Sequence, residues 1–390
     1  MVTNVLRPLD DAPLPAGIRP RFIEGVNGLR MHVLEAGEAG SGRPLILLVH
    51  GFPEIAYSWR KVMPALAAAG YHVVAPDLRG YGRTAAAPVA FADDLAPYRL
   101  HNHLLDLLCL MSALKRDTAA ALVGHDFGSW VCGYCALARP DLFGMVALMS
   151  APFAGAPALD ALAGGLGTPA DDPIHAALAA LPRPRAHYQL YYASAQAAAD
   201  MERSPQGLAG FLRAYFHHKS ADWAGNRPRA LVGWTAETLA ELPTYYVMER
   251  GRTMPETVAP EMPPRGGADC AWLTEEELAV YAGEYARSGF QGALQGYRCR
   301  MDGSLDRDLA RFAGRRIEIP LLFVSGARDW GPFQVPGALE RMAEAAGAGM
   351  LGCHFVAGAG HWVQQEQPQA VADLLLDALG RSRAGSRAGA

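Results

Sequence analysis

Short apolar runs recur along the N-terminal part of the chain and return near its C-terminal end. The runs are Pro44–His50, Tyr71–Asp77, Ala120–Asp126, Met145–Ala151, Pro320–Gly326 and Cys353–His361. Stretches of helical pattern, around residues 59–69, 101–114 and 129–139, separate the first four runs. Continuous apolar strands that alternate with helices are typical of a parallel sheet covered on both faces. The pattern therefore predicts an α/β protein with a mostly parallel central sheet flanked by helices.

Three further segments near the chain ends have a clear pattern. Residues 21–37 alternate around a Gly-Val-Asn-Gly turn, which predicts an antiparallel hairpin. A last helix is expected from about residue 369 to residue 379. The final residues, 381–390, are low in complexity and charged, so we expect a disordered tail there.

The chain changes character between the fourth and fifth apolar runs. Residues 152–300 are helical in pattern, rich in proline and tyrosine, and contain no buried-strand run. An insertion at the carboxyl edge of a parallel sheet is placed to cover the crevice where such sheets bind ligands. We therefore expect a core formed by residues 1–151 and 301–380, with a helical cap domain at 152–300.

Charge and hydropathy limit the classes of partner. The 390-residue chain has a formal net charge of −4 and no dense run of Lys or Arg, which argues against a nucleic-acid partner. No apolar run approaches the roughly 20 residues needed to span a bilayer. Residues 1–17 contain two Asp and three Pro and lack the apolar core of a secretory signal. We therefore expect a cytoplasmic protein without a membrane span.

The six cysteines form neither a disulfide framework nor a repeated metal-binding pattern. Cys132 and Cys135 make a C-x-x-C pair, but they lie on the small-residue helix expected at 129–139, so buried packing is favoured over redox chemistry. Correctly spaced metal-ligating partners are also missing around the paired histidines, which are His101/His103 and His217/His218. The sequence predicts no metal and no organic cofactor, because it offers no nucleotide-binding motif either.

The stretch GHDFG, residues 124–128, lies where an apolar strand turns into a helix. Glycines on both sides allow the tight packing of a nucleophile elbow, which holds the central side chain up into the crevice. The N-terminus of the following helix supplies positive potential that keeps a carboxylate ionised. Asp126 is therefore a candidate nucleophile, although the pentapeptide alone equally allows it to be the N-cap of that helix.

Two downstream residues favour the catalytic interpretation. Asp329 follows the strand expected at 320–326, and His361 lies in a glycine-rich loop after the last strand. The order acidic nucleophile, acid, histidine, with each at a strand end, is that of the α/β-hydrolase triad. The other usual position of the triad acid, after the strand at 145–151, has no carboxylate until Asp160, so Asp329 is favoured.

The stretch HGFPE, residues 50–54, follows the first parallel strand. We expect the backbone N–H of Phe52 to point toward the same place as the N–H of Phe127, which would form an oxyanion hole. Loss of one such donor typically costs about 3 kcal/mol of transition-state stabilisation. His50 is interpreted as a structural residue that orients this loop.

Together with SGARDWG at 325–331 and AGAGHWV at 357–363, these motifs resemble those of the α/β-hydrolase-fold epoxide hydrolases. The resemblance covers most of the chain outside the tail. It implies two cap tyrosines that hydrogen-bond and protonate the epoxide oxygen, and it places them at Tyr188 and Tyr281. Other tyrosines compete for this role, namely Tyr191, Tyr192, Tyr245, Tyr246 and Tyr285.

An aspartate nucleophile indicates that the electrophile is an sp3 carbon. A serine would give an ether that water does not readily cleave, whereas a carboxylate gives an ester that an activated water hydrolyses. Haloalkane and haloacid dehalogenases share this triad and stay as the alternative, but Phe52, Phe127 and Trp130 stand where those enzymes bind halide or carboxylate. A non-catalytic α/β-hydrolase scaffold that only binds a ligand is disfavoured, because no triad member is missing.

The substrate is expected to be a small, neutral and largely apolar molecule. The candidate substrate-binding residues are Pro53, Trp59, Trp130 and Trp362. The run Gln-Gly-Tyr-Arg at 295–298 stands where many relatives have Asn-Trp-Tyr-Arg, and loss of that tryptophan is expected to enlarge or reshape one pocket wall. A homodimer is left open as an assembly state.

Overall fold

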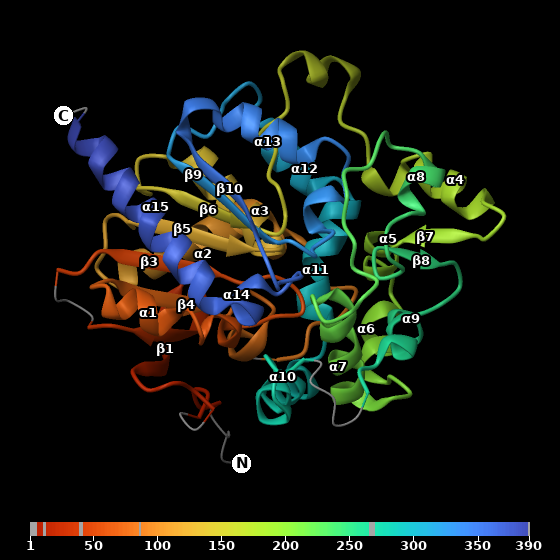
Figure 1. Ribbon diagram of the computed structural model, residues 1–390, viewed down its shortest axis with the longest axis horizontal. Helices are drawn as coiled ribbons and strands as arrows, with labels where there is room; N and C mark the ends of the chain where they lie inside the picture. The colour runs from red at the N-terminus through yellow and green to blue at the C-terminus, as the bar shows by residue number, and fades with distance from the viewer. Residues whose placement is uncertain (1–5, 11–12, 39–41, 86, 265–269, 389–390) are drawn as a thin grey trace.

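The computed structural model describes residues 6–10, 13–38, 42–85, 87–264 and 270–388. An eight-stranded sheet with the order β1-β2-β4-β3-β5-β6-β9-β10 forms its centre (Figure 1). The strands are β1 (Ile18–Val26), β2 (Leu29–Ala36), β3 (Leu45–Val49), β4 (His72–Pro76), β5 (Ala121–His125), β6 (Val146–Met149), β9 (Leu321–Gly326) and β10 (Met350–Val356). The predicted α/β-hydrolase fold is confirmed.

The neighbours β4, β3, β5, β6, β9 and β10 are all parallel to one another, whereas β1 and β2 form the predicted antiparallel hairpin. Strands β3 to β6 are buried along their whole length, which explains their uninterrupted apolar sequence. Strand β10 ends at Val356, so His361 lies in the loop that follows it. The carboxyl ends of these parallel strands meet at one edge of the sheet.

Helices cover both faces of the sheet. The core helices are α1 (Met63–Ala68), α2 (Leu100–Ala113), α3 (Phe127–Ala138), α12 (Ser304–Ala310), α13 (Ala338–Ala346), α14 (Val363–Glu366) and α15 (Pro368–Ala388). Successive strand residues point to opposite faces, so Leu47 packs in the apolar cluster that contains α2 and α3. Its neighbour Leu48 packs in a second cluster, with α1 and α15.

Helix α15 continues through Ala388, so residues 381–388 are helical and the expected disordered tail is not found there. Residues 389 and 390 lie outside the described residues. Two side chains join this part of the helix to the core: Arg381 donates to Leu351 O at 2.7 Å and Ser382 donates to Gly144 O at 3.0 Å. These contacts supply partners that composition alone does not reveal.

Residues 152–300, which we call the inserted segment, lie beside the carboxyl ends of the strands (Figure 1). Their helices are α4 (Ile174–Ala180), α5 (Tyr188–Tyr192), α6 (Ala197–Glu202), α7 (Gly207–Lys219), α8 (Ala236–Leu239), α9 (Met254–Val258), α10 (Glu275–Ser288) and α11 (Gln291–Met301). The last of these ends one residue beyond the predicted boundary. The segment also contains a small antiparallel sheet of β7 (Arg185–His187) and β8 (Val247–Glu249), which the sequence did not predict because each strand has only three residues.

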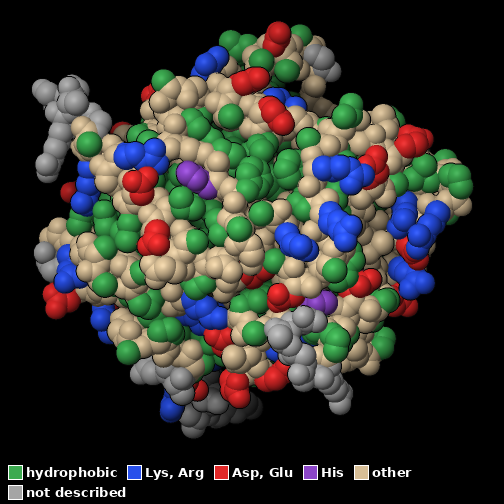
Figure 2. Space-filling view, in the orientation of Figure 1, with side chains coloured by type: hydrophobic (Ala, Val, Ile, Leu, Met, Phe, Trp, Pro, Cys, Tyr) green, Lys and Arg blue, Asp and Glu red, His purple; other side chains and the backbone are tan. Residues whose placement is uncertain are grey.

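Charged side chains of both signs are interspersed over the visible face of the molecule (Figure 2). Within the part of the chain that the structure describes, no helix is both long and apolar enough to cross a membrane.

Candidate active site

Asp126 lies at a strained turn between β5 and α3, with φ of +53° and ψ of −119°. A Cβ added to Gly124 would lie 2.2 Å from Gly128 O, and one added to Gly128 would lie 2.3 Å from Val49 O. Glycine is therefore required on both sides of the turn, as the elbow motif predicted. Asp126 makes no capping hydrogen bond to α3, so its side chain is not used as the helix N-cap.

The structure brings the three predicted triad residues together. His361 lies between the two carboxylates, with Nδ1 at 3.0 Å from Asp329 Oδ1 and Nε2 at 3.4 Å from Asp126 Oδ2. Asp329 is itself held by Ser325 Oγ, at 2.9 Å, and by Gly331 N, at 2.7 Å. This support orients the acid toward His361, and the histidine in turn has its second nitrogen directed at Asp126.

Electrostatics keep both carboxylates ionised. Burial opposes ionisation of Asp126, but the hydrogen bond and charge of His361 outweigh it and hold the pKa of Asp126 well below its usual value. The pKa of Asp329 is also lowered, because His361 and the Gly331 N–H outweigh its burial. An ionised Asp126 is the form that a nucleophile requires.

The predicted oxyanion loop lies against the nucleophile. Phe52 N donates to Asp126 Oδ1 at 3.1 Å, and Phe127 is the first residue of α3, directly after Asp126. A Cβ on Gly51 would lie 2.4 Å from Asp126 Cβ, so the loop approaches this closely only with glycine there. His50 has the expected structural role, since its Nε2 accepts from Leu78 N at 3.0 Å.

A buried pair behind His361 was not predicted from the sequence. His125 contacts Glu54 Oε2 through Nδ1, at 2.6 Å, and His361 O through Nε2, at 2.7 Å. Gln364 and Gln365 each donate to Glu54 Oε1 at 2.9 Å. Both members of the pair lie inside the quoted motifs HGFPE and GHDFG, so the signal was present, but nothing in the spacing showed that they meet.

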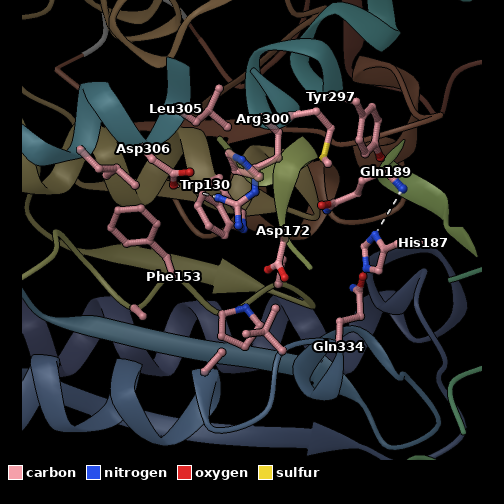
Figure 3. A pocket seen from close by; sticks show the side chains of 18 of the residues that line it. Trp130, Phe153, Asp172, His187, Gln189, Tyr297, Arg300, Leu305, Asp306 and Gln334 are labelled. Atoms are coloured by element: carbon pink, nitrogen blue, oxygen red, sulfur yellow. Dashed lines mark hydrogen bonds and ion pairs between the residues drawn. The ribbon is translucent and has the colours of Figure 1, made fainter. Parts of the chain in front are cut away.

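A cavity of about 960 Å³ opens over Asp126 between the core and the inserted segment. Trp130, Phe153 and Arg300 lie on one side of the view in Figure 3, and Tyr297, Gln189 and His187 lie on the other. Most of the accessible lining is apolar, which suits the predicted apolar substrate.

Tyr188, at the start of α5, lines this cavity as predicted. Its hydroxyl oxygen accepts a hydrogen bond from Gln189 Nε2 at 3.2 Å, which leaves the phenol proton available for donation. Burial, reinforced by the negative charge of Asp126, raises the pKa of Tyr188 well above its usual value. The phenol is therefore neutral and able to donate a proton.

Tyr281 does not line the cavity, contrary to the role expected for it. Its hydroxyl contacts Ser58 Oγ at 2.8 Å and donates to Gln365 Oε1 at 3.0 Å. Its ring packs against Phe216 and Tyr57. Tyr281 therefore links α10 to the core rather than facing Asp126.

Tyr297 on α11 occupies the position that was expected for Tyr281. It lines the cavity, and its ring centroid lies 5.9 Å from that of Tyr188. Burial and the charge of Asp126 raise the pKa of Tyr297 well above its usual value. The signal lay in the Gln-Gly-Tyr-Arg run at 295–298, which keeps the tyrosine of the Asn-Trp-Tyr-Arg pattern although the tryptophan is missing.

Of the four expected substrate-binding residues, only Trp130 lines the cavity. Pro53 is buried in the oxyanion loop, and Trp59 belongs to the core cluster on the opposite face of the sheet. Trp362 donates from Nε1 to Phe216 O at 2.8 Å and packs beside the ring of His361. Each of the two buried tryptophans follows a motif that faces the site, but its side chain points into the core.

The missing tryptophan at position 296 reshapes the cavity wall through Phe127. A Cβ on Gly296 would lie 3.1 Å from the Phe127 ring, so that ring packs directly over the backbone of α11. Phe127 therefore partly fills the space that a smaller residue at 296 leaves.

The competing tyrosines are not among the residues that line the cavity, and these are Tyr191, Tyr192, Tyr245, Tyr246 and Tyr285.

Cys132 and Cys135 are buried, unpaired thiols on α3. Burial raises the pKa of each thiol above its usual value, which disfavours the reactive thiolate and fits a packing role. Among the described residues, no group of three or more His, Cys, Asp or Glu side chains could hold a metal ion.

Comparison with known proteins identifies the family. Residues 44–238 match a family model described as the alpha/beta hydrolase fold, which agrees with the sheet and the elbow at Asp126. Epoxide hydrolase B of Mycobacterium tuberculosis is 34% identical over 91% of this chain and 97% of its own. Epoxide hydrolase A of the same organism is 33% identical over 90% of this chain and 95% of its own.

Solved structures give the same result. An epoxide hydrolase from an endophytic Streptomyces superposes with a TM-score of 0.75 at 35% identity, covering 95% of this chain and 97% of its own. Epoxide hydrolase A from Mycobacterium thermoresistibile gives a TM-score of 0.70 at 33% identity, covering 93% and 98%. The fold and triad place the chain among the α/β-hydrolases. Within that class it belongs to the epoxide hydrolases.

Proposed function

We propose that this protein hydrolyses a neutral, largely apolar epoxide to a vicinal diol through a covalent ester on Asp126. The observation that carries the proposal is that two neutral phenols, Tyr188 and Tyr297, line the same cavity as the ionised carboxylate. An epoxide oxygen becomes strongly basic as the ring opens, so it requires an acid placed opposite the nucleophile.

In the first stage, Asp126 attacks one ring carbon and the C–O bond at that carbon breaks. Tyr188 and Tyr297 hydrogen-bond the departing oxygen, and one of them gives up its phenol proton. The products are an alkyl ester of Asp126, a new hydroxyl group on the substrate and a tyrosinate shared between the two phenols. Burial of both tyrosines beside Asp126 fits this geometry.

In the second stage, His361 accepts a proton from water, which attacks the carbonyl carbon of the ester. Asp329 stabilises the imidazolium, and the N–H groups of Phe52 and Phe127 stabilise the oxyanion. The oxyanion collapses, the diol oxygen leaves with the proton from His361, and the acid proton of Asp126 returns to the tyrosinate. The sum is epoxide plus water to diol.

Within this proposal, residues 152–300 act as a cap domain over a core of residues 1–151 and 301–380. The core supplies the triad and the inserted segment supplies both phenols. A cytoplasmic location and a homodimer stay predictions from the sequence.

The dehalogenase alternative is disfavoured because a halide leaves without a proton, so two proton donors in the cavity of the nucleophile would have no function in that reaction. The experiment that separates the two is incubation of the purified protein with styrene oxide and, in parallel, with a chloroalkane and fluoroacetate. We expect diol from styrene oxide and no halide release. Halide release that survives both Tyr188→Phe and Tyr297→Phe would overturn the proposal.

A further inference from the structure

Lys219, the last residue of α7, has a buried side chain that is only 2% exposed. Its Nζ lies 4.8 Å from the ring centroid of Tyr246, 5.3 Å from that of Tyr215, 5.4 Å from that of Trp362 and 5.7 Å from that of Tyr245. Within the described part of the chain it forms no ion pair or hydrogen bond. Burial of an ammonium group is costly, and the cation–π contacts with these four rings offset part of that cost.

The main chain of Lys219 holds the loop of the catalytic histidine. His361 N donates to Lys219 O at 2.9 Å. The preceding residue, Gly360, passes so close that an added Cβ would lie 2.4 Å from Ser220 C and 2.6 Å from Lys219 O. Lys219 and Ser220 therefore hold the inserted segment closely against the loop of His361.

The charges around Lys219 are mostly negative. Asp126, Asp329 and Glu54 all stabilise its ammonium form, against the burial that lowers the pKa of Lys219. In return, the charge of Lys219 helps to lower the pKa of Asp126. Glu366 is partly buried nearby, where it accepts hydrogen bonds from Ala221 N and Gly360 N, and burial raises its pKa to about 8.

We propose that Lys219 is a positioning residue for the ester-hydrolysis stage, with its carbonyl fixing the His361 loop and its buried ammonium group adding positive charge to the surroundings of Asp126. This inference rests on the proposed epoxide hydrolase reaction. Ester formation removes the negative charge of Asp126, so a cation nearby stabilises the starting state and does not favour that step. Hydrolysis creates negative charge on the same carboxyl group, first as an oxyanion and then as the released carboxylate, so the cation favours this stage.

The test compares Lys219→Met, which keeps the stem and the backbone carbonyl but removes the charge, with Lys219→Arg, which keeps a charge. Rapid quenching after mixing with styrene oxide gives the rate of ester formation from the mass of the intact protein and the rate of hydrolysis from diol. We expect Lys219→Met to form ester at least as fast as the unmodified protein and to hydrolyse it about ten-fold more slowly. The ester should accumulate, kcat and KM should fall together, and Lys219→Arg should restore most of the hydrolysis rate.

Thermal unfolding of each variant shows whether the fold is retained, and Lys219→Gln provides a second neutral variant if Lys219→Met melts early. Equal slowing of both stages, or no change in either, would overturn the role of Lys219. If the unmodified protein gives neither ester nor diol, the proposed function itself fails and this inference fails with it. The two failures are therefore distinguished by the unmodified protein alone.

Discussion

Helices α10 and α11 follow each other along the inserted segment, and Tyr281 of the first lies in a different environment from Tyr297 of the second. On α10, Tyr281 contacts Ser58 and Gln365, so its phenol serves as a link to the core. On α11, Tyr297 faces the cavity beside Tyr188 and within the field of Asp126. A tyrosine in this segment can therefore face the cavity or link the segment to the core, and residue type does not distinguish the two positions.

The largest effect is expected from loss of the proposed nucleophile. Asp126→Ala removes the carboxylate that forms the ester, so diol formation should fall by roughly 10⁴-fold or more. Initial rates of diol release from styrene oxide measure this. Retention of more than a few per cent of the activity would show that the reaction does not pass through Asp126.

The comparison of the two helices is tested directly by Tyr297→Phe and Tyr281→Phe. The first variant loses a proton donor at the ring oxygen, so ester formation should slow by about 10²-fold. The second should keep its rate of ester formation and lose about 1 kcal/mol in the free energy of unfolding, because Ser58 and Gln365 lose a partner. Single-turnover kinetics and urea unfolding measure the two quantities, and the reverse pattern would contradict the assignment.

A smaller effect is expected at the wall of the cavity. A tryptophan in Gly296→Trp must displace the Phe127 ring, since even a Cβ would lie 3.1 Å from it. We expect kcat/KM to fall about ten-fold more for a bulky epoxide such as stilbene oxide than for a small one such as propylene oxide. An equal fall for both substrates would mean that position 296 does not shape the substrate site.

The smallest effect is an expected absence of change with pH. Burial and the charge of Asp126 raise the pKa values of Tyr188 and Tyr297 above the usual value of 10.0, and a group with a raised pKa stays protonated below it. The rate constant of ester formation should therefore not decline between about pH 7 and pH 10. A decline centred near pH 9, measured by single-turnover kinetics, would be inconsistent with neutral phenols.

Much of the core could be predicted because its patterns are local. The parallel strands are continuous apolar runs, and the elbow at 124–128 requires glycine where the backbone of Val49 passes. The order of Asp126, Asp329 and His361 along the chain then defines the triad without knowledge of distances. The short strands β7 and β8 were not predicted, because three residues are too few to show an alternating pattern of apolar and polar positions. The C-terminal end of α15 was not predicted either, because its partners lie far away in sequence.

The inserted segment could not be predicted to the same depth. The choice between Tyr281 and Tyr297 depends on how each helix is rotated relative to the core. Both helices contain other buried residues, so the sequence pattern does not show which side of each helix faces the cavity. Likewise, Trp59 and Trp362 lie beside site motifs, yet their side chains pack in the core. Buried charges such as Lys219 depend on rings contributed by several elements, which no local pattern reveals.

The proposed mechanism passes through a covalent ester on Asp126, and a single turnover in H₂¹⁸O tests this ester most directly. The protein is used in excess over styrene oxide, so that each molecule turns over once. Because water attacks the carbonyl carbon of the ester, one oxygen of the first diol comes from the epoxide and the other from the Asp126 carboxylate, and neither should be ¹⁸O. The ¹⁸O should appear in the peptide that contains Asp126, as measured by mass spectrometry after digestion. Label in the diol of the first turnover, with none at Asp126, would show direct attack of water on the epoxide and contradict the account.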